Sequence, residues 1–189
     1  MGIERFFSSL NKDFDVVSDL TKPYDKINCT HFMIDFNSII HNVSSKMISK
    51  KDYKAIETFE IELVTNIKLQ IIDMLKNNII SDNLEYIMLA IDGVPSFAKM
   101  MEQKKRRYIG DLMNLLLRDV ELPINWSKNN ISPGTQFMDT LCSELKKKEF
   151  MDECKTVCIN LTGILVSDVY NPGEGEMKIV NCLKGIKTS

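Results

Sequence analysis

The sequence contains few of the residues that mark fibrous, low-complexity or membrane proteins. Its 189 residues include 8 glycines, 5 prolines and 1 tryptophan, and neither an internal repeat nor a Gly/Ser-rich linker divides the chain. This composition excludes collagen-like and disordered chains. No apolar run approaches the roughly 18 residues of a membrane-spanning helix. Polar residues directly follow Phe6 and Phe7, where a signal peptide would stay apolar. We therefore expect a single domain over residues 1–189, with no membrane span and no signal peptide.

Cysteine and histidine are also scarce. The five cysteines are odd in number and widely spaced, and the only histidines are His31 and His41. Neither a disulfide framework nor a zinc site is expected from so few ligands at this spacing. Reduced thiols are typical of an intracellular protein, and we expect the cytoplasm rather than the nucleus.

Charge of neither sign dominates. Hydrophobic residues make up 44% of the chain and charged residues 26%, the formal net charge is -2, and the pI is about 5.8. This is the composition of an ordinary globular protein that can bury a sizeable core. It excludes a globally basic nucleic-acid-binding protein but allows a local basic patch.

Two short apolar runs that each end in a carboxylate predict buried strands, at residues 29–35 and 84–92. Between them, apolar residues recur every three or four positions from Ile56 to Leu75, which predicts a long helix with one buried face. This strand, helix, strand order is the unit from which parallel sheets are built.

The second half of the chain continues the alternation. A helix is predicted over residues 96–118, with a basic beginning, and another from Ser132 to Leu145, with Ser132 as its N-cap and Pro133 in its first turn. Residues 156–166 read as a third strand, perturbed at Gly163, and residues 176–183 as the start of a further helix. The sequence thus predicts an α/β fold with a mainly parallel central sheet.

Acidic residues follow each predicted strand. Asp35 and Asp92 end the first two, and Glu174 and Glu176 follow the third in a Pro-Gly-Glu-Gly-Glu segment. Ligands of such sheets collect at the carboxyl ends of the strands, and clustered carboxylates favour a divalent cation such as Mg²⁺. Taken singly, each acid also has a purely structural explanation: Asp35 as a helix cap, Asp92 as part of a turn, and the two glutamates as a solvated loop.

A basic set lies on the helix that begins near Ser96. Lys99, Gln103, Arg106 and Arg107 are spaced so that they share one helical face, where they can bind a phosphate group. The alternative is an ordinary solvated charged face.

Three further features have weaker signals. His41 lies six residues after Asp35 and can stack on a base near the same edge, or be an ordinary surface histidine. Trp126 is interpreted as a packing residue, and Met100, Met101 and Met113 as core residues.

Several motifs occur together and in a characteristic order. They are Met1-Gly-Ile3 with Phe6-Phe7, Asp35-Phe-Asn-Ser-Ile-Ile-His41, Ala90-Ile-Asp-Gly-Val94 with Ala98-Lys-Met100 and Arg106-Arg107, Ser132-Pro-Gly-Thr135 with Phe137-Met138, and Ser167-Asp168 with Pro172-Gly-Glu-Gly-Glu176 and Lys178-Ile179. In these motifs the chain resembles the N-terminal nuclease region of the XRN family of 5′ to 3′ exoribonucleases.

The resemblance implies a PIN/flap-nuclease-like, three-layer α/β domain that uses Mg²⁺ or Mn²⁺. It also implies stepwise hydrolysis of single-stranded RNA with a 5′-monophosphate by a two-metal-ion mechanism. By motif matching, the catalytic and metal-site acids are Asp35, Asp92, Glu174 and Glu176. The matching 5′-phosphate and RNA-binding residues are Lys99, Gln103, Arg106, Arg107 and, stacking on the first base, His41.

The chain departs from the family pattern at three places. Met177 stands where the family has a histidine, Met101-Glu102 replaces amide residues, and the chain ends at Ser189 before an Asp-x-Asp pair of the family's metal site. We therefore expect an incomplete, C-terminally truncated nuclease domain. An active exoribonuclease is the leading interpretation. The alternatives are a catalytically impaired homologue that binds 5′-phosphorylated RNA ends without cutting, and a chain completed by further nuclease segments of the same or another polypeptide.

Overall fold

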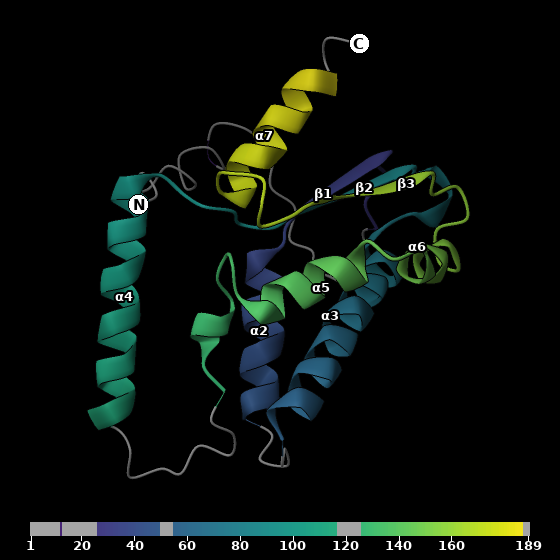
Figure 1. The fold of residues 1–189 in the computed structure, drawn as a ribbon. Coiled ribbons are helices and arrows are strands. Elements are labelled where there is room, and N and C mark those ends of the chain that lie inside the picture. The colour runs from purple at the N-terminus through teal and green to yellow at the C-terminus, as the bar shows by residue number, and fades with distance from the viewer. Residues whose placement is uncertain (1–11, 13–25, 50–54, 117–125, 187–189) are drawn as a thin grey trace.

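The computed structural model describes residue 12 and residues 26–49, 55–116 and 126–186. In these residues, a three-stranded sheet lies between one helix on one side and a group of helices on the other (Figure 1). The strands are β1 (His31–Asp35), β2 (Tyr86–Ala90) and β3 (Gly163–Ser167). The helices are α2 (Asn37–Ile48), α3 (Ile56–Asn78), α4 (Phe97–Leu116), α5 (Gln136–Leu145), α6 (Lys148–Lys155) and α7 (Gly175–Ile186). The Met1-Gly-Ile3 motif and the end of the predicted helix at residue 118 lie outside the described residues.

The sheet is parallel, as predicted, with β2 in the centre. Asp35 lies beside Ala90, and Ala90 lies beside Ser167, so the three strands end at the same level. Loops that leave the strands at this edge therefore begin close to one another. β1 and β2 fall within the predicted ranges 29–35 and 84–92 and are each five residues long.

The third strand begins later than predicted. Only the last part of the predicted range 156–166 is extended, from Gly163 onward, and Gly163 is the first strand residue rather than a bulge. The preceding residues form turns after α6, in which Cys158 and Leu161 are buried in the core. Buried turn residues produce the same short apolar run as a strand, which explains the error.

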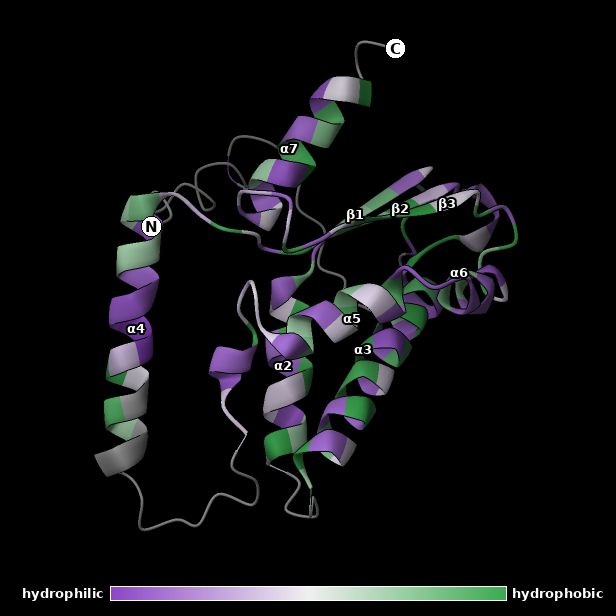
Figure 2. Ribbon diagram, viewed as in Figure 1, coloured by the Kyte–Doolittle hydropathy of each residue, from purple (hydrophilic) through white to green (hydrophobic). Residues whose placement is uncertain are grey.

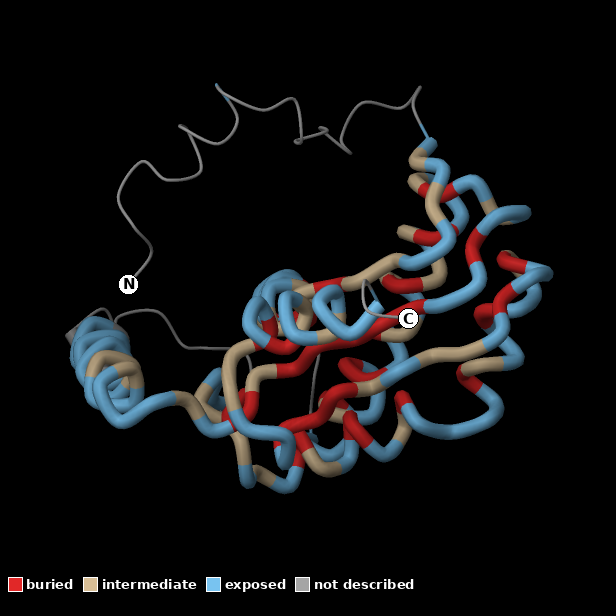
Figure 3. Tube along the Cα trace, turned by 90° about the horizontal axis from the view of Figure 1, so that it is seen from above, coloured by how far each residue is buried: buried red, intermediate tan, exposed pale blue. Residues whose placement is uncertain are grey.

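The two faces of the sheet differ in their cover. Phe32, Ile34, Ile87 and Leu89 belong to one hydrophobic core with α3, α5 and α6. The opposite face contacts α7, which packs on β1 and β2. Leu165, on this second face, is 54% exposed. Buried residues accordingly follow the strands through the middle of the molecule (Figure 3).

The long helix α3 has the predicted buried stripe. Phe59, Leu63, Ile67, Ile71 and Leu75 are fully buried, while Ile56 in the first turn is exposed. Hydrophobic and hydrophilic residues alternate around α3 and its neighbours, as expected of helices that cover one side of a core (Figure 2).

The helix predicted with Ser132 as its N-cap begins three residues later than expected. Thr135 is the N-cap of α5, with its hydroxyl accepting from the Met138 N–H at 3.5 Å. Ser132 and Pro133 lie in the preceding turn, where Gly134 adopts a φ of 85°. Thr135 rather than Ser132 is therefore the N-cap, because residues 132–134 form a turn before the helix begins.

Helix α4 extends along one side of the molecule. Its residues Met100, Met101 and Met113 are 42%, 53% and 52% exposed, so their assignment to the core is wrong. Trp126 is a packing residue, as predicted. Its ring lies 5.1 Å from Phe59 and 5.5 Å from Phe137, and its Nε1 donates to Glu60 Oε1 at 2.8 Å.

All five cysteines are free thiols. Burial raises the pKa of Cys154 to about 12, so this thiol stays protonated at neutral pH.

Among the described helices, none combines the length and the apolar character needed to cross a membrane.

Candidate active site

The four acids singled out from the sequence lie at the carboxyl edge of the sheet. Asp35 is the last residue of β1, and Asp92 follows β2 by two residues. Glu174 directly precedes α7, Glu176 lies in its first turn, and α7 packs against β1 and β2. The three parallel strands end side by side, and short connections follow them. The four acids therefore lie at the same edge of the sheet.

A cleft of about 670 Å³ opens beside this edge, between α2, α4 and the segment around η2 (Lys128–Asn130). All nine residues assigned to the site from the sequence line it: Asp35, His41, Asp92, Lys99, Gln103, Arg106, Arg107, Glu174 and Glu176. The structure therefore brings the predicted acidic and basic sets into one cleft. Their roles stay predictions.

The carboxylate of Asp92 is held from two sides. Asn37 Nδ2 donates to Oδ2 at 2.9 Å, and the Gly175 N–H donates to Oδ1 at 2.7 Å. The Asp92 N–H in turn donates to Asn37 Oδ1 at 3.2 Å. Asn37 was not among the predicted site residues, although it stands two positions after Asp35 in a motif that the sequence analysis noted.

Asp35 has a different environment. Its Oδ1 is buried and accepts no hydrogen bond within the described structure. Burial first, and then the charges of Asp92, Glu176 and Glu174, raise the pKa of Asp35 above its ordinary value. A Cβ at position 175 would lie 2.7 Å from this oxygen, so a glycine is needed there for α7 to approach.

These acids fit a divalent cation in their chemistry. Carboxylate oxygens are the ligands that Mg²⁺ prefers, and a buried oxygen without a partner among mutually repelling acids is stabilised by a cation. Within the described residues, however, no group of three or more His, Cys, Asp or Glu side chains is already drawn together around one metal position.

The basic wall of the cleft comes from α4. Lys99 Nζ lies 3.5 Å from Glu174 Oε2, which links the basic wall to the acidic edge. Arg106 forms an ion pair with Glu102, one turn earlier on the same helix. Gln103 and Arg107 also line the cleft. The helical face predicted from the spacing thus faces the cleft, with two of its cations engaged by carboxylates.

His41 lies on α2, on a different wall of the cleft. Desolvation by the surrounding protein, together with the charges of Lys128 and Arg107, lowers the pKa of His41, while Asp92 acts in the opposite sense. Lys128 Nζ donates to Ser45 Oγ at 2.7 Å and lines the same cleft. Lys128 was missed because a lone lysine in a polar loop has no distinguishing pattern.

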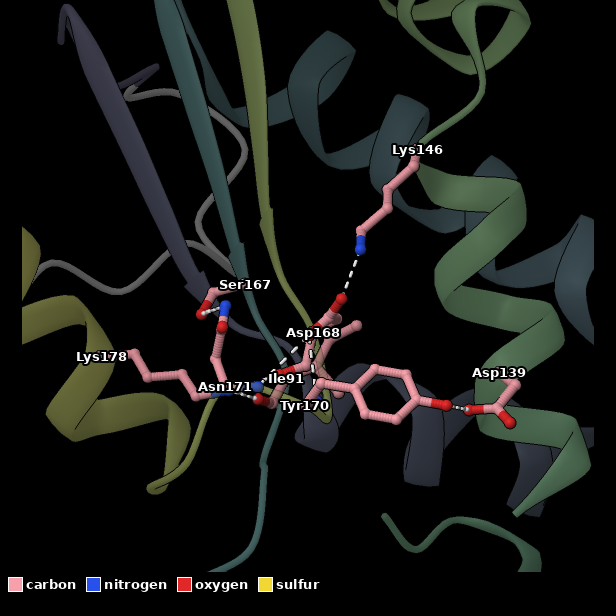
Figure 4. A network of polar contacts seen from close by, with 8 residues as sticks. All are labelled: Ile91, Asp139, Lys146, Ser167, Asp168, Tyr170, Asn171 and Lys178. Carbon is pink, nitrogen blue, oxygen red and sulfur yellow. Dashed lines mark hydrogen bonds and ion pairs between the residues drawn. The ribbon is translucent and has the colours of Figure 1, made fainter. Parts of the chain in front are cut away.

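The loop after β3 is braced by Asp168. Lys146 pairs with its Oδ2, and its Oδ1 accepts from the N–H groups of Tyr170 at 3.0 Å and Asn171 at 3.3 Å (Figure 4). Burial alone would raise the pKa of Asp168, but these partners lower it. The Tyr170 hydroxyl donates to Asp139 at 2.9 Å, which ties the loop to α5.

The loop after β2 lies directly against the loop after β3. Gly93 N–H donates to the Gly173 carbonyl at 2.9 Å. A Cβ at Gly93 would lie 1.9 Å from the Asn171 carbonyl oxygen. Only glycine allows this close approach of the two backbones, which places the loop after Asp92 against the loop that precedes Glu174.

The fold and the cleft define a class of protein: an α/β domain that presents clustered acids and a basic helix to one ligand, an arrangement suited to phosphate esters. Comparison of the whole sequence identifies the family. Residues 1–189 match the family described as XRN 5′-3′ exonuclease N-terminus, and the chain belongs to it. This confirms the resemblance drawn from the motifs.

Individual relatives carry exoribonuclease names. The chain is 28% identical over 193 residues to 5′-3′ exoribonuclease 2 of Schizosaccharomyces pombe, covering 90% of this chain and 18% of that protein. It is 29% identical over 207 residues to 5′-3′ exoribonuclease 1 of Saccharomyces cerevisiae, covering 100% of this chain and 12% of that protein. With the human 5′-3′ exoribonuclease 1 it shares 26% identity over 195 residues, or 99% of this chain and 11% of that protein. The chain thus spans less than a fifth of the length of these relatives.

Proposed function

We propose that this chain forms the nuclease region of a 5′ to 3′ exoribonuclease that hydrolyses single-stranded RNA with a 5′-monophosphate. The observation that carries the proposal is the cleft that contains both the acids Asp35, Asp92, Glu174 and Glu176 and the basic face of α4. Membership of the XRN family supports exonuclease chemistry. Further nuclease segments, in the same or another polypeptide, belong to this proposal.

In the proposed reaction, the four acids hold Mg²⁺ or Mn²⁺ through their carboxylate oxygens. When bound, a pair of such cations activates a water and stabilises the leaving oxygen of a phosphodiester. Asp92 is oriented for this role by Asn37 and by the Gly175 N–H. The unpartnered Oδ1 of Asp35 supplies a further acceptor for a cation.

The basic face of α4 orients the RNA. Lys99, Gln103, Arg106 and Arg107 donate hydrogen bonds to a terminal phosphate, and the adjoining phosphodiester then lies toward the acids. Binding of the end before cleavage accounts for a 5′ to 3′ direction. A 5′-hydroxyl lacks the charge that this wall binds.

A second candidate function is capture of 5′-phosphorylated RNA ends without cleavage. It is favoured by one observation: among the described residues, no three acids are already gathered around one metal position. Both functions use the basic wall, and they differ only in the chemistry at the acidic edge.

The test uses the full chain and a 3′-labelled, single-stranded RNA with a 5′-monophosphate. We expect shortening from the 5′ end in Mg²⁺, weak for this chain without the further nuclease segments, and none in excess EDTA. The variant Asp92→Asn should not cleave, because it keeps the shape of the side chain but loses the charge that holds the cation. The control variant Asp152→Asn changes an exposed acid on α6 and should behave as the wild type.

Three other results would change the interpretation. Unaltered hydrolysis in EDTA would contradict the cation-dependent reaction. Tight binding of the phosphorylated end without cleavage would favour the capture function. Absence of both binding and cleavage would contradict both functions.

A further inference from the structure

Helix α7 carries a lysine that is buried rather than solvated. Lys178 is 8% exposed and lies two residues after Glu176. Removing an ammonium from water is unfavourable unless hydrogen bonds replace its hydration. Burial accordingly lowers the pKa of Lys178, while the charges of Asp168 and Asp92 act in the opposite sense. The hydrogen-bond partners of the buried ammonium therefore determine what this lysine does.

Both partners are backbone carbonyls of residues that lie just after the ends of strands. Lys178 Nζ donates to the carbonyl oxygen of Ile91 at 2.6 Å and to that of Asp168 at 2.7 Å (Figure 4). Ile91 follows β2 and directly precedes Asp92, and Asp168 directly follows β3. One ammonium therefore joins α7 to the connections that leave two neighbouring strands.

A second contact from α7 acts on the same residue of the site. The Gly175 N–H donates to Asp92 Oδ1 at 2.7 Å, and Gly175 lies three positions before Lys178, about one helical turn away. Lys178 thus holds the backbone beside Asp92, while Gly175 holds its carboxylate. Together they set how the first turn of α7, with Glu176, faces Asp92.

We propose that Lys178 is a positioning residue, which holds the connections after β2 and β3 against α7 so that Asp92 and Glu176 stay together at the edge of the sheet where a divalent cation binds. The proposal rests on the proposed function, because the cation is the ligand of the same site. Lys178 itself does not contact the cation or the RNA. It acts through the two backbone carbonyls.

Charge and position predict opposite effects of removing this lysine. If Lys178 influenced the acids only through its charge, its loss would make the edge more negative and cation binding tighter. If it holds the edge in place, its loss separates the ligands and cation binding weakens. The sign of the change therefore distinguishes the two.

The experiment measures Mn²⁺ binding to the full chain by titration calorimetry, well below the melting temperature of each variant. Lys178→Met should weaken binding by about tenfold to a hundredfold, the range found when residues that orient metal ligands are removed. Lys155→Met removes an exposed lysine from α6 and should bind as the wild type. If Lys178→Met does not fold, Lys178→Gln, which keeps a polar donor, is measured in its place.

A second readout needs no cation. Amide hydrogen exchange of Gly175 reports its hydrogen bond to Asp92, and in EDTA it should be faster in Lys178→Met than in the wild type. Unchanged or tighter Mn²⁺ binding with unchanged Gly175 exchange would overturn the positioning role. A wild type that binds no Mn²⁺ would instead contradict the metal part of the proposed function, and Gly175 exchange would then decide the role of Lys178 alone.

Discussion

Removing the acidic partner of Arg106 should strengthen the binding of a 5′-phosphate. Glu102 and Arg106 are four residues apart on α4 and form an ion pair, with side chains 30% and 62% exposed. A phosphate that binds Arg106 must compete with this carboxylate, which is also a like charge close to the incoming phosphate. The variant Glu102→Gln keeps the length of the side chain and removes its charge.

The size of the effect follows from the two interactions that compete. A charge-assisted hydrogen bond from Arg106 to phosphate contributes about 1.5–3 kcal/mol, or roughly tenfold to a hundredfold in affinity. Exposed pairs at this helical spacing contribute little, so Glu102→Gln should raise the affinity only about twofold. Arg106→Ala should lower the affinity for the 5′-phosphate by about tenfold, the low end of this range. The loss is small because Arg106 of the wild type must first break its ion pair with Glu102.

Fluorescence anisotropy in EDTA measures this without cleavage, using matched oligonucleotides with a 5′-phosphate or a 5′-hydroxyl. The gain in Glu102→Gln and the loss in Arg106→Ala should appear for the phosphorylated RNA and be small for the hydroxyl. Glu57→Gln, an exposed acid on α3, serves as the control for net charge. Equal changes for both RNA ends would refute the reasoning, since α4 would then bind only the RNA backbone in general.

Three further variants test the structure around the site. Gly93→Ala should lower the free energy of unfolding by about 3 kcal/mol or more in urea denaturation, because its Cβ would lie 1.9 Å from the Asn171 carbonyl; a stability equal to the wild type would mean that the two loops separate easily. The pKa of Asp168 is lowered in the folded state, so its pairing with Lys146 stabilises the protein above the ordinary carboxyl range and is lost in acid. Asp168→Asn should therefore lower the melting temperature at pH 7 and match the wild type at low pH, and a pH-independent difference would contradict this. The pKa of Asp35 is raised, so its ionised form destabilises the cation-free fold as the pH rises; Asp35→Asn should raise the melting temperature in EDTA at pH 7, with no gain in acid, and a loss at pH 7 would show that the charge is already compensated.

Much of the site was open to prediction from local pattern. The apolar period of α3, the runs that became β1 and β2, and the acids that follow them are properties of neighbouring residues. The spacing of Lys99, Gln103, Arg106 and Arg107 likewise needs only the geometry of one helix. Such features depend on residues that are close together in the chain, so they can be predicted from the sequence alone.

Other features depended on which segments meet. The start of β3 at Gly163 was set by pairing with Tyr86, and the start of α5 by a turn, although the apolar and capping signals began earlier. Asn37 became a partner of Asp92 because 55 residues of chain return to the same edge of the sheet.

Lys178 is the clearest case. In the sequence it is one lysine among many charged residues on a helix, with nothing to indicate burial. Its carbonyl partners at Ile91 and Asp168 lie 87 and 10 residues away in the chain. Local sequence determines which helix carries this side chain. Only the packing of α7 on the sheet decides whether its ammonium is hydrated or donates to the two backbone carbonyls. Burial and hydrogen-bond partners arise when the elements pack together, and no single element determines them.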